Sequence, residues 1–224
     1  MRQWTDEEFH NTRHYASLTE ALEFFKNDPL VFEPGTRTLY TSLGYNLLGM
    51  AVENASGQGY LDYMRENVFS PSGMETAGLD DVFALVPHRA QGYQKAPGGE
   101  LFNSSLSDTS NRVPGGGLAA TAEDVARFAL ALHSGALLKN ETREQMFVRQ
   151  RTRDGKATGY GLGWAVGTQR RRREVYHLGG QPRVSTMLYI LPDSGVAVVF
   201  LTNLEGVGAP LLDLARQVAE IVQR

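Results

Sequence analysis

The sequence contains no cysteine, and this absence removes several kinds of chemistry at once. Without thiols the chain forms no disulfide, no thiolate metal site and no cysteine nucleophile. Long apolar runs are missing too, because no stretch reaches the 18 or more residues that a membrane helix needs. Neither charge sign dominates, with 22 Lys and Arg against 25 Asp and Glu, and no arm carries one sign. We therefore expect no membrane span and no nucleic acid as the main partner, since phosphate backbones bind concentrated basic faces.

The 224 residues, 42% of them hydrophobic, are enough for one domain with a sizeable core. Apolar residues at helical spacing and helix-capping residues predict helices in the first part of the chain. These predicted helices cover residues 18–26, 42–55, 60–69, 122–134 and 140–147. The second of them carries an apolar stripe, and Gly57 is placed to end it.

After residue 150 the period changes to short β-branched and aromatic segments separated by turn residues. Strands are predicted at residues 160–166, 174–178, 186–191 and 196–202, followed by a helix at 211–222. The fold class is α+β in one domain, mainly helical over 17–150 and antiparallel strands plus a helix over 160–224. No segment before residue 150 is predicted to be a strong strand that would add to this sheet. The helices predicted before residue 70 therefore need some other surface to pack against.

Two short motifs carry candidate site residues. Tyr40 and Ser42 come just before a predicted helix, which puts both hydroxyls near its positive N-terminal end. The alternative is an ordinary serine cap beside a half-buried tyrosine. His177 ends a predicted strand and is followed by Gly179 and Gly180, whose N–H groups can bind substrate or an oxyanion. The alternative is a bulged strand end with a surface histidine.

The other motifs point to no cofactor. Residues 115–117 are three glycines without the Lys and Ser or Thr of a phosphate-binding loop. His10 and His14 have no clear third ligand, so we expect neither a metal nor an organic cofactor. The arginine run at 170–173 is predicted to be a solvated hairpin tip, with an anion-binding patch as the alternative.

Taken in order, the motifs resemble the serine β-lactamase-related family, which includes class C β-lactamases, D-Ala-D-Ala peptidases and related esterases. The resemblance runs from about residue 17 to the C-terminus. It is strongest to the branch of mitochondrial serine β-lactamase-like proteins and their bacterial relatives. The segments that carry it are Pro34-Gly35-Thr36, Tyr40-Thr41-Ser42, Gly44-Tyr45-Asn46, Pro71-Ser72-Gly73-Met74, Gly116-Gly117-Leu118, Thr121-Ala122-Glu123-Asp124, Tyr160-Gly161-Leu162-Gly163-Trp164 and His177-Leu178-Gly179-Gly180.

The resemblance implies a β-lactamase/transpeptidase-like fold and a role for each motif. The family works with Ser-x-x-Lys, a Tyr-x-Asn or its equivalent, and Lys-Thr-Gly or His-Thr-Gly. It implies that Tyr40 moves a proton, with Ser42 where Asn is common. It also implies that His177 lines the opposite wall and that the N–H of Gly180 is an oxyanion donor. Leu178 stands where a threonine hydroxyl usually meets a substrate carboxylate, which disfavours penicillin-like substrates.

The Ser-x-x-Lys motif is absent, because no serine in the sequence has a lysine three residues later. We therefore expect the C-terminal portion of a serine hydrolase that lacks the N-terminal strands and the nucleophile helix. The parent enzyme would cleave an amide or ester in a small molecule or peptide through an acyl-enzyme, and this chain alone would be inactive. The alternative is a non-catalytic remnant or partner-binding protein that self-associates or assembles with a complementing N-terminal segment. A third interpretation is a binding module with chance motifs.

Overall fold

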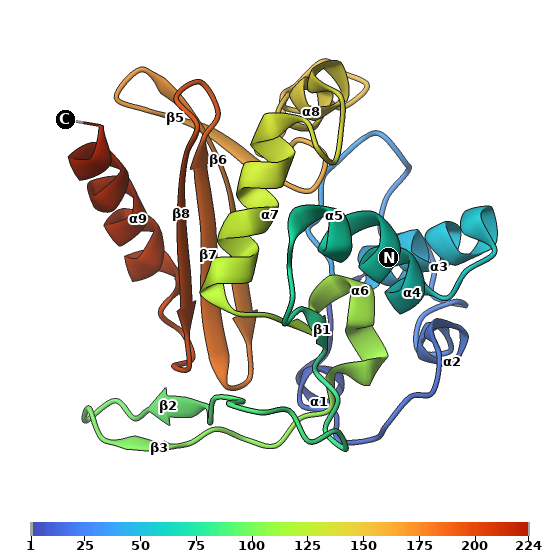
Figure 1. Ribbon diagram of the computed structural model, residues 1–224. Coiled ribbons are helices and arrows are strands. Elements are labelled where there is room, and N and C mark those ends of the chain that lie inside the picture. Colours follow the sequence, from blue (N-terminus) through green and yellow to red (C-terminus); the bar gives the residue numbers. More distant parts are fainter. Residues whose placement is uncertain (1, 224) are drawn as a thin grey trace.

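One antiparallel sheet of four strands organises the C-terminal third of the chain in the computed structural model, which describes residues 2–223 (Figure 1). Its strands follow sequence order: β5 (Ala165–Gln169), β6 (Arg172–Gln181), β7 (Val184–Leu191) and β8 (Val196–Thr202). Two helices cover its faces, α7 (Ala122–Ser134) on one side and α9 (Gly208–Val222) on the other (Figure 1).

The remaining elements form a helical part beside the sheet, and α8 lies near one end of the sheet (Figure 1). Its helices and helical turns are α1 (Asp6–Phe9), α2 (Leu18–Leu22), α3 (Leu43–Ser56), α4 (Tyr60–Met64), the π-turn η1 (Arg65–Phe69), α5 (Ser70–Ser72), the 3-10 turn η2 (Thr109–Arg112), α6 (Val113–Gly116) and α8 (Asn140–Met146). Four short strands make two separate pairs, β1 (Gly78–Leu79) with β4 (Leu118–Ala119), and β2 (Tyr93–Lys95) with β3 (Leu101–Asn103).

The core follows from strand alternation, because successive side chains of a strand point to opposite faces. On β7, Met187, Tyr189 and Leu191 are buried against α9. Ile190, between them, is buried on the other face together with Leu132 of α7. Both faces of the sheet are therefore occupied, and the α+β fold class is confirmed.

Several predicted boundaries are confirmed by local geometry. The Thr121 hydroxyl accepts a hydrogen bond from the N–H of Asp124 and caps α7, which ends at Gly135 with φ 85°. Gly57, with φ 71°, ends α3 in the same left-handed conformation, which glycine adopts without a Cβ penalty. Strand β8 has the predicted bounds.

Three predicted elements differ from the structure. The helix predicted to Lys26 ends at Leu22 and continues only as turns. The helix predicted to stop before Pro71 instead widens into η1 and continues through α5 to Gly73. Pro71 has no N–H to donate, and it lies where the hydrogen-bond pattern of the helix changes from η1 to α5. The predicted strand at 160–166 begins only at Ala165, since Gly163 turns the chain with φ 82°.

Helix α3 is confirmed, but its apolar stripe is not covered. Leu47 and Leu48 are 41% and 59% exposed, and Ala51 and Ala55 on the same side are exposed too. The buried side instead contains Leu43, Asn46 and Gly49. Gly49 is close to Pro114, so that a Cβ on Gly49 would collide with the proline ring. The helix is thus packed through its less apolar side.

The turn between β5 and β6 confirms the predicted hairpin tip. Gln169 pairs with Arg172, so Arg170 and Arg171 are its two central residues. Their φ angles are 47° and 68°, the left-handed values that a two-residue type I′ turn requires.

Over residues 2–223 no helix is both long and apolar enough to cross a membrane.

Candidate active site

The structure brings Tyr40 and His177 together from distant parts of the chain. Tyr40 lies in the segment before α3, and His177 lies in the middle of β6. Their ring centroids are 6.0 Å apart, and the ring of Tyr160 lies 5.9 Å from that of Tyr40 on another side. Tyr40 is 42% exposed, so its ring is open to solvent while it contacts two other aromatic groups.

An open strand edge adjoins this cluster. Strand β5 pairs with β6 only from Arg172 to Tyr176, whereas β7 pairs with it up to Gln181. Within the part of the chain that the structure describes, residues 177–181 therefore have no strand partner on the β5 side. The backbone N–H and C=O groups of such an edge can pair with an extended substrate.

The two glycines on this edge differ in their surroundings. A Cβ on Gly180 would meet nothing within 4 Å, so the space beside its backbone is open. A Cβ on Gly179 would collide with the hydroxyl of Thr186, the residue directly opposite on β7. Gly179 is therefore required for strand packing, and Gly180 leaves room for a ligand to approach its N–H group.

A third wall comes from α6, which sequence reasoning missed. A Cβ on Gly115 would lie 2.9 Å from the carbonyl oxygen of Ser42, and one on Gly116 would collide with the side chain of Gln181. Helix α6 thus fits between the start of α3 and the end of β6. The close approach of Gly115 and Gly116 to both walls was not predictable from local sequence.

Ser42 is at the N-cap position of α3, but its hydroxyl does not cap the helix. The neighbouring Thr41 hydroxyl accepts a hydrogen bond from the N–H of Leu43 at 3.3 Å and donates to the carbonyl oxygen of Arg2 at 2.6 Å. The interpretation of Ser42 as an ordinary side-chain cap is therefore wrong. Among residues 2–223, no group forms a hydrogen bond with the Ser42 hydroxyl, which leaves it available to a ligand.

Burial determines the protonation of the site. The pKa of His177 is lowered because burial disfavours the charged imidazolium, so the ring is neutral at pH 7. Burial also raises the pKa of Tyr45 and of Tyr160, and in both cases the negative charge of an ionised Tyr40 would add to this increase. Over the described range, no Lys or Arg stacks on the Tyr40 ring. Burial therefore keeps His177, Tyr45 and Tyr160 in their neutral forms.

The other candidates lie away from this site or have structural roles. His14 pairs with Asp108 at 2.9 Å. His133 lies against the β7–β8 turn, where a Cβ on Gly195 would come within 2.9 Å of its Nε2. Trp164 is buried edge-on against Phe147. Between residues 2 and 223, no group of three or more His, Asp or Glu side chains is arranged to hold a metal ion.

Comparison with known proteins identifies the family of this chain. The family model described as Beta-lactamase matches residues 2–223. The chain belongs to the beta-lactamase family. The family of serine hydrolases suggested by the motifs is therefore confirmed, together with its fold.

Relatives of this beta-lactamase family member include a serine beta-lactamase-like protein and penicillin-binding proteins. The chain is 30% identical to the mitochondrial serine beta-lactamase-like protein LACTB of Mus musculus, over 87% of this chain and 42% of that protein. It is 30% identical to penicillin-binding protein 4 of Amycolatopsis lactamdurans, over 76% of this chain and 48% of that protein. The chain thus spans less than half the length of these relatives.

Two solved structures have the same fold as this chain. A penicillin-binding protein from Bacillus halodurans superposes with a TM-score of 0.75 at 26% identity, covering 91% of this chain and 62% of that chain. A D-amino acid amidase from Ochrobactrum anthropi has a TM-score of 0.78 at 20% identity, covering 96% of this chain and 68% of that chain, and supports the fold alone.

Proposed function

We propose that this chain forms the proton-transfer and substrate-binding walls of a serine hydrolase that cleaves amides or esters through an acyl-enzyme. The observation that carries the proposal is the placement of Tyr40 opposite His177, next to the open edge of β6 over residues 177–181. A proton-transfer group beside a strand edge that offers free N–H donors is what acyl transfer needs.

Each group has a distinct role in this proposal. Tyr40 accepts a proton from the nucleophile and passes it to the leaving group. His177, neutral at pH 7, offers a hydrogen bond from the opposite wall without adding charge. The N–H of Gly180 donates to the oxyanion of the tetrahedral intermediate, and the Ser42 hydroxyl binds substrate or relays the proton.

The nucleophile does not come from these 224 residues, in which no serine is followed by a lysine at the third position. In this proposal a nearby cation helps Tyr40 to act as a base, because a positive charge favours the ionised form of a phenol. A segment with Ser-x-x-Lys supplies both groups, the serine nucleophile and the cation. We propose that such a segment covers the exposed stripe of α3 and that the chain alone forms no acyl-enzyme.

The substrate is proposed to be a neutral amide or ester in a small molecule or peptide. The resemblance to the family implies that Leu178 stands where a hydroxyl would meet a substrate carboxylate, and the Leu178 side chain lies near Gly208 at the start of α9. A site without that hydroxyl gives up a hydrogen bond to a penicillin-like carboxylate. No metal and no organic cofactor is needed for this mechanism.

The test is covalent labelling with a fluorophosphonate probe. The 224-residue chain alone should take no label, and a longer product of the same locus that carries Ser-x-x-Lys should be labelled. In that product, Tyr40→Phe should slow acylation by about 10²–10⁴, the usual range for a lost proton-transfer group. Tyr63→Phe on α4 is the matched control and should leave the rate unchanged. An unlabelled longer product, or an unchanged rate in Tyr40→Phe, would contradict the proposal.

The second candidate is a non-catalytic protein that binds a partner, and one observation favours it. The stripe of Leu47, Leu48, Ala51 and Ala55 on α3 is apolar and exposed. Such a stripe on a surface is typical of an interaction site. In this case a longer product with Ser-x-x-Lys would not exist, which reading the DNA upstream of the Met1 codon would establish.

A further inference from the structure

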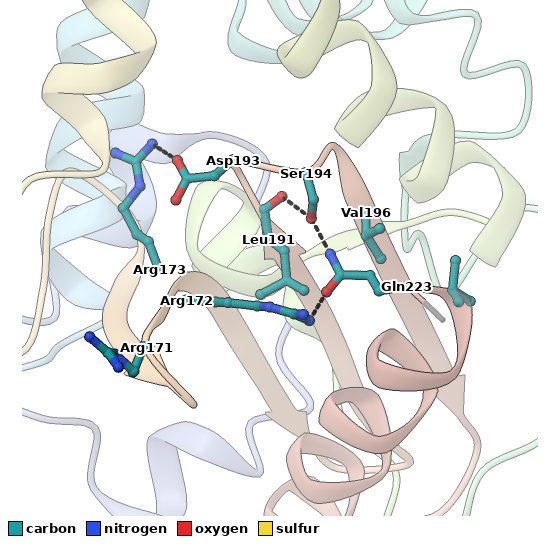
Figure 2. Close-up of a pocket in the computed structure, with 9 residues that line it drawn as sticks. Arg171, Arg172, Arg173, Leu191, Asp193, Ser194, Val196 and Gln223 are labelled. Carbon is teal, nitrogen blue, oxygen red and sulfur yellow. Dashed lines mark hydrogen bonds and ion pairs between the residues drawn. The ribbon is translucent and has the colours of Figure 1, made fainter.

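A hollow of about 540 Å³ lies at one end of the sheet, away from the candidate active site. It is bounded by the β5–β6 turn, the β7–β8 turn and the end of α9 (Figure 2). The side chains that matter for its chemistry are Arg171, Arg172, Arg173, Leu191, Val196 and Val222.

The hollow is separate from the active site because the two lie at different positions along β6. Arg172 begins this strand and His177 lies five residues further on. A strand rises by about 3.3 Å per residue, so the two positions are about 17 Å apart. A small ligand bound in the hollow therefore does not reach Tyr40 or His177, and an inference about it is independent of the proposed hydrolase.

The arginines of this run differ in whether their charge is compensated. Arg173 pairs with Glu144 at 2.6 Å and with Asp193 at 2.7 Å, and Arg170 pairs with Glu220 at 2.8 Å. Arg172 extends across the hollow to donate to the uncharged side chain of Gln223 (Figure 2). Arg171 stands apart from both at the turn, and within residues 2–223 it has no hydrogen bond or ion pair (Figure 2). Among residues 2–223, therefore, no carboxylate pairs with the guanidinium group of Arg171 or of Arg172.

The backbone of the turn gives no reason for arginine at residue 171. Its φ of 68° belongs to the left-handed region, which side chains with a Cβ disfavour and which Asn and Gly adopt readily in type I′ turns. A strained residue in a turn points to a use for its side chain. The side chain here is a cation at the rim of a hollow.

Part of the lining of the hollow is apolar, and Ser194, Gln223 and Asp193, which pairs with Arg173, line it as well. Leu191 is buried at the end of β7, and Val196 and Val222 line the same space from β8 and α9. A ligand that fits this hollow therefore has two parts, an anionic group for the arginines and an apolar group for the apolar part of the lining.

We propose that this hollow binds a phosphate monoester that carries an apolar substituent. A guanidinium binds phosphate oxygens through two parallel hydrogen bonds, and a phosphate monoester carries a charge of about −1.5 to −2 at pH 7. Its charge is opposite to that of Arg171 and Arg172, which both line the hollow. Leu191, Val196 and Val222 contact the apolar substituent.

The experiment measures binding of two probes to the chain, phenyl phosphate by calorimetry and phosphatidic acid in phosphatidylcholine vesicles by co-sedimentation. We expect saturable binding at one site, with phenyl phosphate bound more tightly than inorganic phosphate. Arg171→Gly and Arg172→Gln should each weaken binding by about tenfold or more, as expected for lost hydrogen bonds to a charged group. Arg171→Gly also suits the left-handed backbone, so a loss of binding in this variant does not come from unfolding.

The matched control is Arg170→Gln, which removes the same charge from the adjacent residue but outside the hollow, and it should change binding by less than about twofold. Binding of free phenyl phosphate supports a soluble ligand, whereas binding of phosphatidic acid vesicles alone supports a lipid headgroup. The proposal is overturned if neither probe binds, if Arg170→Gln weakens binding as much as Arg172→Gln, or if inorganic phosphate binds as tightly as phenyl phosphate.

Discussion

Tyr40 and His177 illustrate how single residues acquire chemical properties from their surroundings. Neither motif is distinctive by itself, because a tyrosine before a helix and a histidine in a strand are common. Their 6.0 Å separation comes from the docking of the α3 segment beside β6. Burial then determines the charge of His177, which no neighbouring residue in the sequence specifies.

The lowered pKa of His177 predicts how stability depends on pH. The unfolded chain keeps the ordinary histidine pKa near 6.5, so below this value it binds a proton that the folded chain resists. The free energy of unfolding should therefore decrease as pH falls from about 6.5 towards the lower pKa of the folded state, and change no further below it.

Urea unfolding between pH 7.5 and 5 measures this effect. His177→Gln should lose less stability over the acidic part of the range than the unsubstituted chain. His88 is exposed, so His88→Asn should retain the full dependence on pH. An unchanged pH dependence in His177→Gln would show that burial of this imidazole does not oppose its protonation.

At the scale of elements, α9 is tied to the sheet by a buried polar network. The Glu174 carboxylate, 2% exposed, accepts hydrogen bonds from Tyr189 Oη at 3.0 Å and from Arg216 Nη2 at 2.6 Å. Burial and the nearby Glu174 carboxylate both raise the pKa of the Tyr189 hydroxyl, so it remains a donor. The network fixes the position of α9 along the sheet.

We predict that Glu174→Gln destabilises the fold by about 2–4 kcal/mol, because it leaves the Arg216 charge without its buried partner. The chain offers a matched control, since Arg170 and Glu220 also join the sheet to α9 but do so in solvent. Arg170→Gln should cost less than about 1 kcal/mol, as is usual for exposed pairs. Equal losses of unfolding free energy in the two variants, measured in urea, would mean that burial contributes nothing to the Glu174 pair.

At the scale of the whole molecule, the most unusual feature is the exposed apolar stripe of α3. A helix normally buries its apolar side, whereas α3 packs through Leu43, Asn46 and Gly49 and leaves Leu47 and Leu48 exposed. Asn46 lies fully buried and donates to the carbonyl oxygen of Asn111 at 2.8 Å, which shows that this packing is specific. The stripe is therefore free to contact a complementing segment or another copy of the chain.

We predict that the chain alone self-associates through this stripe at micromolar concentration. In sedimentation velocity, Leu48→Lys should shift the distribution towards monomer, because the added charge makes association through Leu48 unfavourable. Leu130→Lys is the control, since Leu130 is equally exposed at 59% but lies on α7. A monodisperse, cooperatively melting monomer without any substitution would contradict both self-association and an unfilled α3 surface.

The sequence by itself determined the family, the α+β class and most local boundaries. Gly57 and Gly135 end their helices because only glycine enters the left-handed conformation freely, and this preference acts within one turn of the chain. The order of the motifs along the chain indicated the family, and the family model confirms it. The roles of Tyr40, Ser42, His177, Gly179 and Gly180 in catalysis remain predictions for the labelling experiment.

Only the tertiary structure decided which surfaces meet. Leu47 and Leu48 are periodic enough to predict a helix, but the pattern does not say whether anything covers them. The fit of Gly115 and Gly116 between α3 and β6 was equally unpredictable, because it depends on the distance between two backbones that are remote in sequence. Local conformation follows from preferences within a few residues, whereas burial and close approach depend on every element that packs there. The site is therefore a property of the packing, although the sequence supplies its groups.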